Sequence, residues 1–215
     1  MKRNLIWLVL AVMMLALTGC GSSSDDRVFV ETVIPSDPVV DGDIVDVAGI
    51  ATPIVSLVGR DGLLSVRAGV DIGTDDVYRA FLHFPLTSVP LNARIESATL
   101  SIVISSVTVL PPTASIPIRI ELVSFTPPLI PDDFDRILLP PLSSTSIVPA
   151  ISSLDVNREV NVDVTPLMVE AQFRGLDNFQ IRILQENDFT TAIPGLIEID
   201  EATAANEPLL TVVYF

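Results

Sequence analysis

The chain of 215 residues is poor in the side chains that most often carry catalysis, metal binding and cross-links. It contains one cysteine, one histidine, one tryptophan and two tyrosines. A single cysteine excludes a disulfide within the chain, and a single histidine leaves no second imidazole for a zinc site or a catalytic dyad. The sequence also lacks a Gly-x-Ser-x-Gly nucleophile elbow. We therefore predict that the protein is not an enzyme, and the alternative left open is a carboxylate pair that only the fold brings together.

Positive charge is scarce as well. The chain has 27 acidic and 12 basic residues, a formal net charge of −15, and Lys2 is its only lysine. Such a surface repels the phosphate backbone of nucleic acids, so we exclude nucleic acid as a partner. The same charge opposes electrostatic attraction of the whole domain to anionic lipids.

Residues 1–19 have the organisation of a secretory signal peptide. Lys2 and Arg3 form a short basic region, and an apolar region follows from Leu5 to Leu17. The apolar region is too short to span a bilayer comfortably, and no later stretch reaches the roughly 18 apolar residues that a transmembrane helix needs. We predict that residues 1–19 are removed on export.

The end of this segment, Leu17-Thr18-Gly19-Cys20, resembles the lipobox of bacterial lipoproteins. The resemblance implies cleavage before Cys20, a diacylglycerol thioether on its sulfur and usually an acyl chain on the new N-terminus. Two or more chains make a stable anchor, whereas one holds a protein only marginally. The alternative is an ordinary signal peptide with a chance cysteine.

Removal of residues 1–19 takes away Lys2, Arg3 and Trp7, so the mature protein would contain no tryptophan and a net charge of −17. Residues 20–27 are small, polar and acidic, and are predicted to form a flexible, lipid-anchored tether. We expect the protein on the bacterial cell envelope. Cys20 is followed by Gly21 rather than by an aspartate. This resembles the pattern that directs lipoproteins to the outer membrane where the source has two membranes.

From Val28 onward the apolar residues follow a period of two, which is typical of strands with one solvated face. In residues 95–104, Leu100, Ile102 and Ile104 alternate with threonine and serine. The same alternation occurs at 116–122, 160–164 and 179–184, and the chain ends in another β-rich run at 209–215.

The sequence therefore predicts a single all-β domain over residues 28–215, an antiparallel β-sandwich of jelly-roll type. Seventeen prolines and ten glycines leave no room for long helices. One short helix is predicted over 166–173, with Thr165 as its N-cap and a stop at Gly175. Residues 126–153 are rich in proline and serine and are predicted to form a long loop.

The segment Val77 to Ile102, "VYRAFLHFPLTSVPLNARIESATLSI", resembles the DNRLRE-domain family of secreted β-sandwich proteins. "LLSVRAG" before it, and "VNVDVTPLM", "FQIRIL" and "EPLLTVVY" after it, resemble further segments of the family in the same order. This chain departs from the family in having Pro85 where an aspartate is frequent, and in lacking tryptophans in its middle segment. The resemblance implies a jelly-roll-like sandwich on cell surfaces and, in one branch, a carbohydrate-binding module for polysaccharides such as alginate.

Arginines on the predicted strands are the candidate ligand-binding residues. Arg67 and Arg79 lie on adjacent predicted strands, with Tyr78 beside them, and Arg119 and Arg182 lie on later strands. Guanidinium groups bind carboxylates in a bidentate manner, so these residues could form a face for an acidic sugar. The alternative is that each arginine pairs across the sheet with an aspartate or glutamate.

Aspartates near glycines provide a candidate site for structural calcium. Asp41 and Asp43 lie in one cluster, and Asp71, Asp75 and Asp76 lie in another. Calcium takes six to eight oxygen ligands, often from such loops, although neither cluster has EF-hand spacing. The alternative is that these aspartates are solvated turn residues. No other cofactor is predicted.

The single histidine, His83, alternates with Leu82 and Phe84 and is expected to face outward or toward a loop. We expect a surface or hydrogen-bonded residue without a metal or a catalytic role. Two functions remain for the whole chain. The first is a lipid-anchored, non-catalytic surface binding or adhesion module, with extracellular polysaccharide as the candidate ligand. The second is an accessory lipoprotein that docks a protein partner in the envelope.

Overall fold

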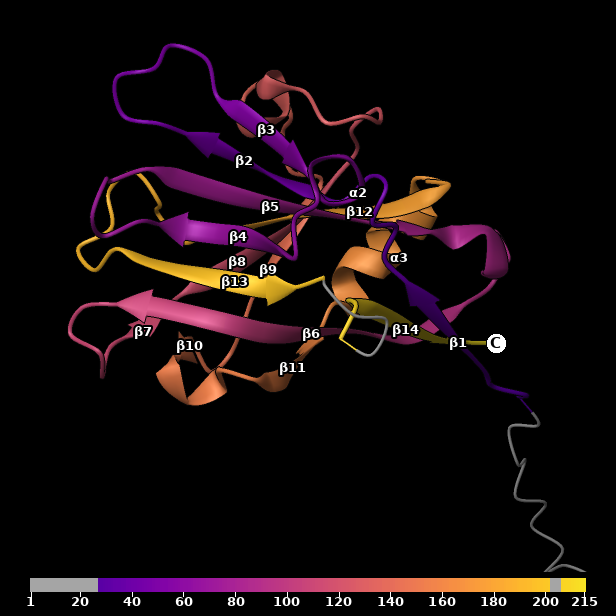
Figure 1. Ribbon diagram of the computed structural model, residues 1–215. Coiled ribbons are helices and arrows are strands. Elements are labelled where there is room, and N and C mark those ends of the chain that lie inside the picture. The colour runs from indigo at the N-terminus through magenta and orange to yellow at the C-terminus, as the bar shows by residue number, and fades with distance from the viewer. Residues whose placement is uncertain (1–26, 202–205) are drawn as a thin grey trace, which may run out of the picture.

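The computed structural model describes residues 27–201 and 206–215 of the chain. The predicted signal peptide, Cys20 and all of the predicted tether except Arg27 lie outside the described residues. Within these ranges nearly every regular element is a strand, and every strand pairing is antiparallel (Figure 1). The all-β, antiparallel prediction is therefore confirmed.

The elements follow one another along the chain with short connections. The strands are β1 (Val30–Pro35), β2 (Gly42–Asp46), β3 (Ile54–Leu57), β4 (Ser65–Val70), β5 (Val77–Pro85), β6 (Ile95–Val109), β7 (Ser115–Ile116), β8 (Ile118–Val123), β9 (Ser143–Ser146), β10 (Ile151–Ser152), β11 (Arg158–Asp163), β12 (Asn178–Gln185), β13 (Gly195–Asp200) and β14 (Leu209–Tyr214). The helices are α2 (Val58–Asp61) and α3 (Thr165–Phe173), and the 3-10 turns are η1 (Leu86–Ser88), η2 (Pro131–Phe134) and η3 (Ser153–Asp155).

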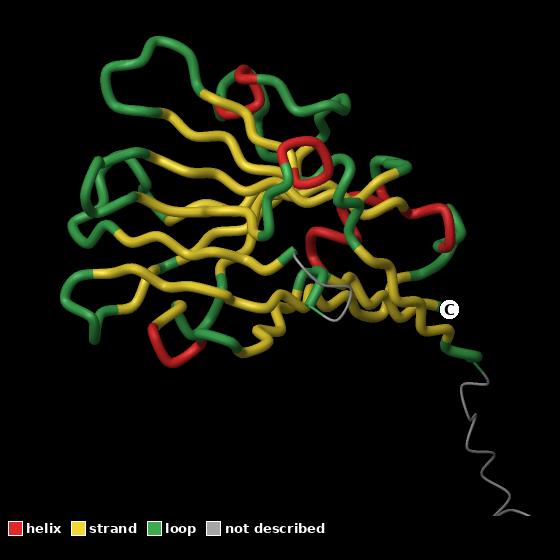
Figure 2. Tube along the Cα trace, in the orientation of Figure 1, coloured by secondary structure: helices red, strands yellow, loops and turns green. Residues whose placement is uncertain are grey.

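One large sheet curls around the core (Figure 2). Its main path of paired strands is β1-β14-β6-β13-β4-β5-β12-β8-β9, while β11 pairs with β6 and β2 pairs with β3 and β5. The long strand β6 organises the curl. One edge of β6 pairs with β14 along its first half and with β13 along its second half, while the other edge pairs with β11. The sheet divides at this point, so that β14 leads to β1 and β13 leads to β4 and the remaining strands.

The main core fills the inside of this curled sheet. Leu100, Ile102 and Ile104 of β6 are buried there, as the alternating pattern predicts. Alternate residues of β5, β8 and β12 meet them from the other layer. Burial of these aliphatic and aromatic side chains stabilises the fold at about 25 cal/mol per Å² of apolar surface removed from water.

The outer face of β5, β8 and β12 is not solvated, and here the prediction was wrong. Gln180 and Arg182 alternate with core residues of β12, yet both are buried. Residues 125–139 cross this face and form a second, smaller apolar cluster with Phe81 and Val123 beneath them. These three strands are therefore covered on both faces.

The predicted loop at 126–153 is correspondingly more ordered than expected, since it contains η2, β9 and β10. The predicted helix is α3, which ends at Phe173, and Gly175 adopts the left-handed backbone (φ +65°) typical of a helix stop. Thr165 is the first helical residue rather than the cap. Its hydroxyl instead accepts a hydrogen bond from the Ala98 N–H at 2.9 Å, which ties α3 to β6.

Two carboxyl groups are buried together beside the core. Asp41 Oδ1 accepts the His83 N–H at 2.7 Å, whereas Asp41 Oδ2 and Glu201 Oε1 find no hydrogen-bond donor among the described residues. Burial, followed by repulsion from Glu201, raises the pKa of Asp41 well above its usual range. Burial, followed by repulsion from Asp200 and Glu207, raises the pKa of Glu201 to about 8. The folded protein therefore favours protonated carboxyls at this position.

We expect Glu201→Gln to remove part of the pH dependence of stability. The unfolded chain releases the Glu201 proton near the ordinary pKa of 4.5, whereas the folded chain keeps it up to about pH 8. The stability that this group contributes is thus fully present below pH 4.5 and is lost as the pH rises towards 8. Urea unfolding across this range should show a shallower decline for Glu201→Gln than for the unsubstituted protein.

The exposed Glu159 provides a matched control, because Glu159→Gln changes the same charge on the surface. This control should leave the slope of stability against pH unchanged. An identical slope for the unsubstituted protein and Glu201→Gln would contradict the assignment of the buried pair.

Candidate functional site

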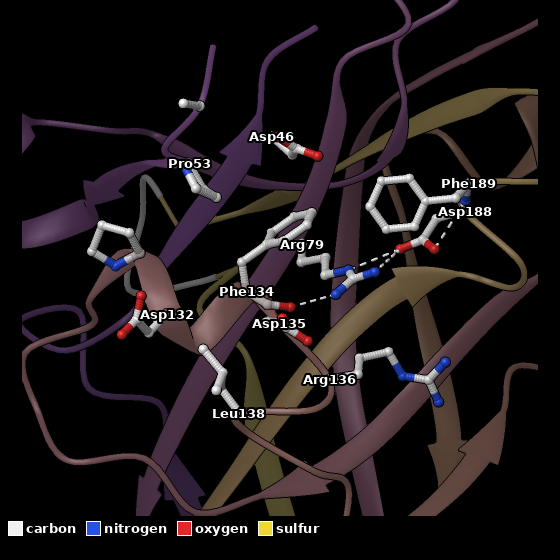
Figure 3. Close-up of a pocket in the computed structure, with 12 residues that line it drawn as sticks. Asp46, Pro53, Arg79, Asp132, Phe134, Asp135, Arg136, Leu138, Asp188 and Phe189 are labelled. Carbon is white, nitrogen blue, oxygen red and sulfur yellow. Dashed lines mark hydrogen bonds and ion pairs between the residues drawn. The ribbon is translucent and has the colours of Figure 1, made fainter. Parts of the chain in front are cut away.

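A cleft of about 540 Å³ opens over the outer face of the sheet, within the usual size range for small-molecule sites (Figure 3). Its walls come from three places in the chain: the β2–β3 connection, residues 131–138 and the turn that follows β12. Arg79 of β5 lies at its base, between Phe134 and Phe189. The cleft is therefore assembled from segments far apart in the sequence.

Arg79 holds two walls of the cleft together. Its side chain is buried, and its Nε and Nη2 lie 2.8 and 2.7 Å from Asp188 Oδ2. Its Nη1 donates to the Phe134 carbonyl oxygen. The guanidinium lies over the Phe134 ring at 4.1 Å and near the Phe189 ring at 5.4 Å. Both rings are fixed in place by a charged group whose charge Asp188 already neutralises.

Arg182, on the neighbouring strand β12, fixes the floor of the cleft from below. Its Nη2 lies 2.7 Å from Oε2 of Glu121, the residue directly opposite on β8. It also donates to the carbonyl oxygens of Asp133 and Leu139 at 3.0 and 3.1 Å. Arg136 reaches the other Glu121 oxygen at 2.5 Å. Burial lowers the pKa of Arg182, although Glu121 opposes the shift. These bonds secure residues 131–139 to the sheet.

His83 continues this polar layer. Of the two expected positions, the structure shows the one toward a loop, because the imidazole is hydrogen-bonded and lies against Phe125. The side chain is 7% exposed, and its Nδ1 lies 3.1 Å from Gln180 Nε2. Since an amide nitrogen can only donate, we assign His83 as the neutral tautomer that accepts at Nδ1. Burial lowers the pKa of this imidazole, which favours the same neutral state. The amide of Gln180 also pairs with the backbone N–H and carbonyl of Phe125, each at 3.0 Å.

The mouth of the cleft combines apolar surface with carboxylates. Phe189 is 60% exposed and Leu138 is 62% exposed. Asp46, Asp132 and Asp135 line the same opening, and none of them forms an ion pair within the described residues. Arg79, Arg136 and Arg182 share two carboxylates, Asp188 and Glu121, which leaves one positive charge. The three aspartates of the opening outweigh it, so the opening is electronegative.

The four predicted arginines do not gather at one site. Of the four, only Arg79 lines the cleft. Arg67 lies 2.9 Å from Asp43 and stacks over the Tyr78 ring at 4.3 Å, and Arg119 lies 2.5 Å from Glu186. Arg182 is buried against Glu121. Each guanidinium therefore has a carboxylate partner, the arrangement described above as the alternative.

The predicted calcium ligands are likewise separated. Asp41 and Asp43 are buried and accept hydrogen bonds from His83 and Arg67. The other three, Asp71, Asp75 and Asp76, lie in or beside the β4–β5 turn, where Asp71 Oδ1 accepts two backbone N–H groups. Within residues 27–201 and 206–215, no group of three or more histidine, cysteine, aspartate or glutamate side chains is placed to hold a metal ion.

No protein-family model matches this chain, and no curated protein matches it. In the part of the chain that the structure describes, no helix is both long and apolar enough to cross a bilayer. The function proposed for the cleft therefore rests on the residues that line it.

Several residues of the cleft were not predicted from the sequence. Phe134 and Phe189 each follow acidic residues in "PDDF" and "ENDF", immediately beyond or between predicted strands. An aromatic residue in such an acidic turn could have indicated a binding surface. Asp188 and Glu121 gave no comparable indication, because their roles depend on arginines that only the fold brings close.

We expect Glu121→Gln to destabilise the protein by roughly 3–5 kcal/mol, because it leaves the buried Arg182 without a counter-charge. Urea unfolding would measure the loss. Glu186→Gln makes the same change in the partly exposed pair with Arg119 and should cost about 1 kcal/mol or less. Equal losses for the two variants would show that the Arg182 pair does not secure residues 131–139.

Proposed function

We propose that the protein is a lipid-anchored, non-catalytic binding module of the cell envelope, and that the cleft above Arg79 binds a saccharide. The observation that carries the proposal is the pairing of an exposed aromatic ring with carboxylates that form no ion pair at one opening. Phe189 supplies the ring, and Asp46, Asp132 and Asp135 supply hydrogen-bond acceptors.

A sugar ring matches this combination chemically. Its C–H faces pack on aromatic rings, and its hydroxyl groups donate to carboxylates. Arg79 holds Phe134 and Phe189 in place before any ligand arrives, so little ordering is needed on binding. The electronegative opening favours a neutral sugar, or one carrying an amine, over a uronate.

Carboxylates are the only candidate nucleophiles in the described lining of the cleft. The described lining of the cleft includes no serine, threonine, cysteine, histidine or lysine. Apart from these carboxylates, the described lining includes no side chain that could act on a glycosidic bond. A test of saccharide binding should therefore also measure whether shorter sugars are released.

The position of the cleft supports a role facing away from the membrane. Arg79 lies near the start of β5, and Pro85 ends β5 about 20 Å away, at about 3.3 Å per residue. Figure 1 shows the β2–β3 connection at one end of the molecule and the start of β1 at the other. A lipid on Cys20 would hold the second end at the bilayer and present the cleft to the outside.

A second candidate is the docking of an envelope protein. Ile137 and Leu138 beside the cleft are 86% and 62% exposed, which gives the opening an apolar border that a protein partner could cover. Protein binding would use this border, whereas sugar binding would use Phe189 and the carboxylates.

Phe189→Ala should weaken saccharide binding at least tenfold, because the ring provides the stacking surface. Calorimetry with panels of neutral, amino and uronic oligosaccharides would measure the loss. Phe173→Ala removes an equally large exposed ring from the end of α3, outside the lining of the cleft, and should leave the affinity unchanged. If no oligosaccharide binds, or if both variants bind equally, the saccharide proposal is wrong. Release of shorter sugars would indicate a glycoside hydrolase instead.

Cys20→Ser should release the protein from membranes, because serine offers no sulfur for the thioether. Membrane fractionation would show the variant in the soluble fraction, and mass spectrometry of the N-terminal peptide would show the lipid on the unsubstituted protein alone. Retention of Cys20→Ser in the membrane fraction would contradict the anchor.

A further inference from the structure

We propose that the end of the domain where β1 begins rests on the bilayer surface, with Phe29, Leu91 and Phe173 inserted among the lipid headgroups. This inference rests on the proposed lipid anchor and adds a second contact with the same membrane. These three side chains are 53%, 74% and 85% exposed. Contacts between their neighbours connect the start of β1, the segment before β6 and the last turn of α3. We call the end where β1 begins the proximal end.

A chain of contacts makes the proximal end one continuous surface. The Phe29 ring packs edge-on against the Phe215 ring, with centroids 5.5 Å apart. The backbone of Phe215 pairs with that of Arg94 through bonds of 2.9 and 3.1 Å. Leu91, three residues before Arg94, borders a groove whose other wall is α3, and Gln172 of α3 donates to the Pro90 carbonyl oxygen at 3.3 Å. Phe173 follows on the same helix.

The arginines of the proximal end suit a headgroup layer. Arg27 and Arg94 lie over the Phe215 ring at 4.6 and 5.5 Å. Long cationic side chains beside aromatic rings can extend to lipid phosphates while their stems cover apolar surface. The charge of the whole chain is strongly negative. The bilayer contact therefore depends on the apolar side chains and on zwitterionic headgroups, and not on anionic lipid.

The length of the tether limits how far the proximal end can lie from the membrane. Six residues separate a lipidated Cys20 from Arg27, and the seven Cα–Cα steps between the two span at most about 25 Å when fully extended. Val28, which follows directly, is 78% exposed and continues the apolar surface towards the tether. A tether of this length would therefore bring the exposed apolar residues of the proximal end close to the bilayer.

A single tryptophan can report this contact, because Trp7 is lost with the signal peptide and the processed protein has no other. We suggest Phe173→Trp in the processed lipoprotein, reconstituted in phosphatidylcholine vesicles with bromines near the top of the acyl chains. Interfacial side chains lie about 5–10 Å into the headgroup region, so bromine should quench this tryptophan at least roughly twofold. Leu91→Trp provides a second reporter if the first variant folds poorly.

Ile137→Trp is the matched control, since Ile137 is equally exposed but lies between Arg136 and Leu138, which line the cleft. It should show no quenching. Flotation with the vesicles and the mass of the N-terminal peptide report the anchor separately. If the protein floats with the vesicles but bromine quenches neither Phe173→Trp nor Leu91→Trp, the proposed bilayer contact is wrong and the anchor stands. Loss of flotation would overturn both. Equal quenching of Ile137→Trp and Phe173→Trp would also contradict the proposed orientation of the domain on the bilayer. If Phe173→Trp is not quenched and position 173 crosslinks two copies of the protein, the proximal end is a contact between copies instead.

Discussion

Two buried arginines on neighbouring strands determine the shape of the outer face of β5 and β12, where the candidate site lies. A guanidinium carries five N–H donors and cannot lose its charge, so burial requires acceptors on all sides. Arg79 and Arg182 find them in Asp188 and Glu121 and in the carbonyl groups of residues 133–139. Residues 131–139 in turn need hydrogen-bond donors for those carbonyl groups, because no neighbouring strand supplies such donors. The arginines and residues 131–139 therefore satisfy each other, and the cleft is the space left between them.

The fold could be predicted from the sequence because strand alternation is a local property. Leu100, Ile102 and Ile104 are buried because each is two residues from the next, whatever the rest of the chain does. The helix at α3 was predictable for the same reason, from Pro166 at its start and Gly175 at its end. The curl of the sheet was less so, because it arises where the edge of β6 passes from β14 to β13, a pairing of distant segments.

The outer face could not be predicted in the same way. Gln180, Arg182 and Glu121 have the alternation of solvent-facing residues, and their burial depends on a segment about fifty residues away from β12. That segment contains many prolines, which indicated a loop, but Phe125, Leu129 and Phe134 within it form an apolar cluster. The candidate site likewise depends on contacts between residues far apart in the sequence. Arg79 could be identified as one residue of interest, whereas the carboxylate that neutralises it lies 109 residues later in the chain.

The pairing of β1 with β14 has a mechanical consequence for an anchored protein. β1 begins at the proximal end and forms a six-residue antiparallel ladder with β14, from Val30–Tyr214 to Pro35–Leu209. Ladder hydrogen bonds run perpendicular to the strands. Under the proposed function, tension between a ligand in the cleft and a lipid on Cys20 would pull on the start of β1. A pull along the strand would load all of these bonds together in shear and would not open them one at a time. In that arrangement β1 would carry the pulling force between the ligand and the membrane.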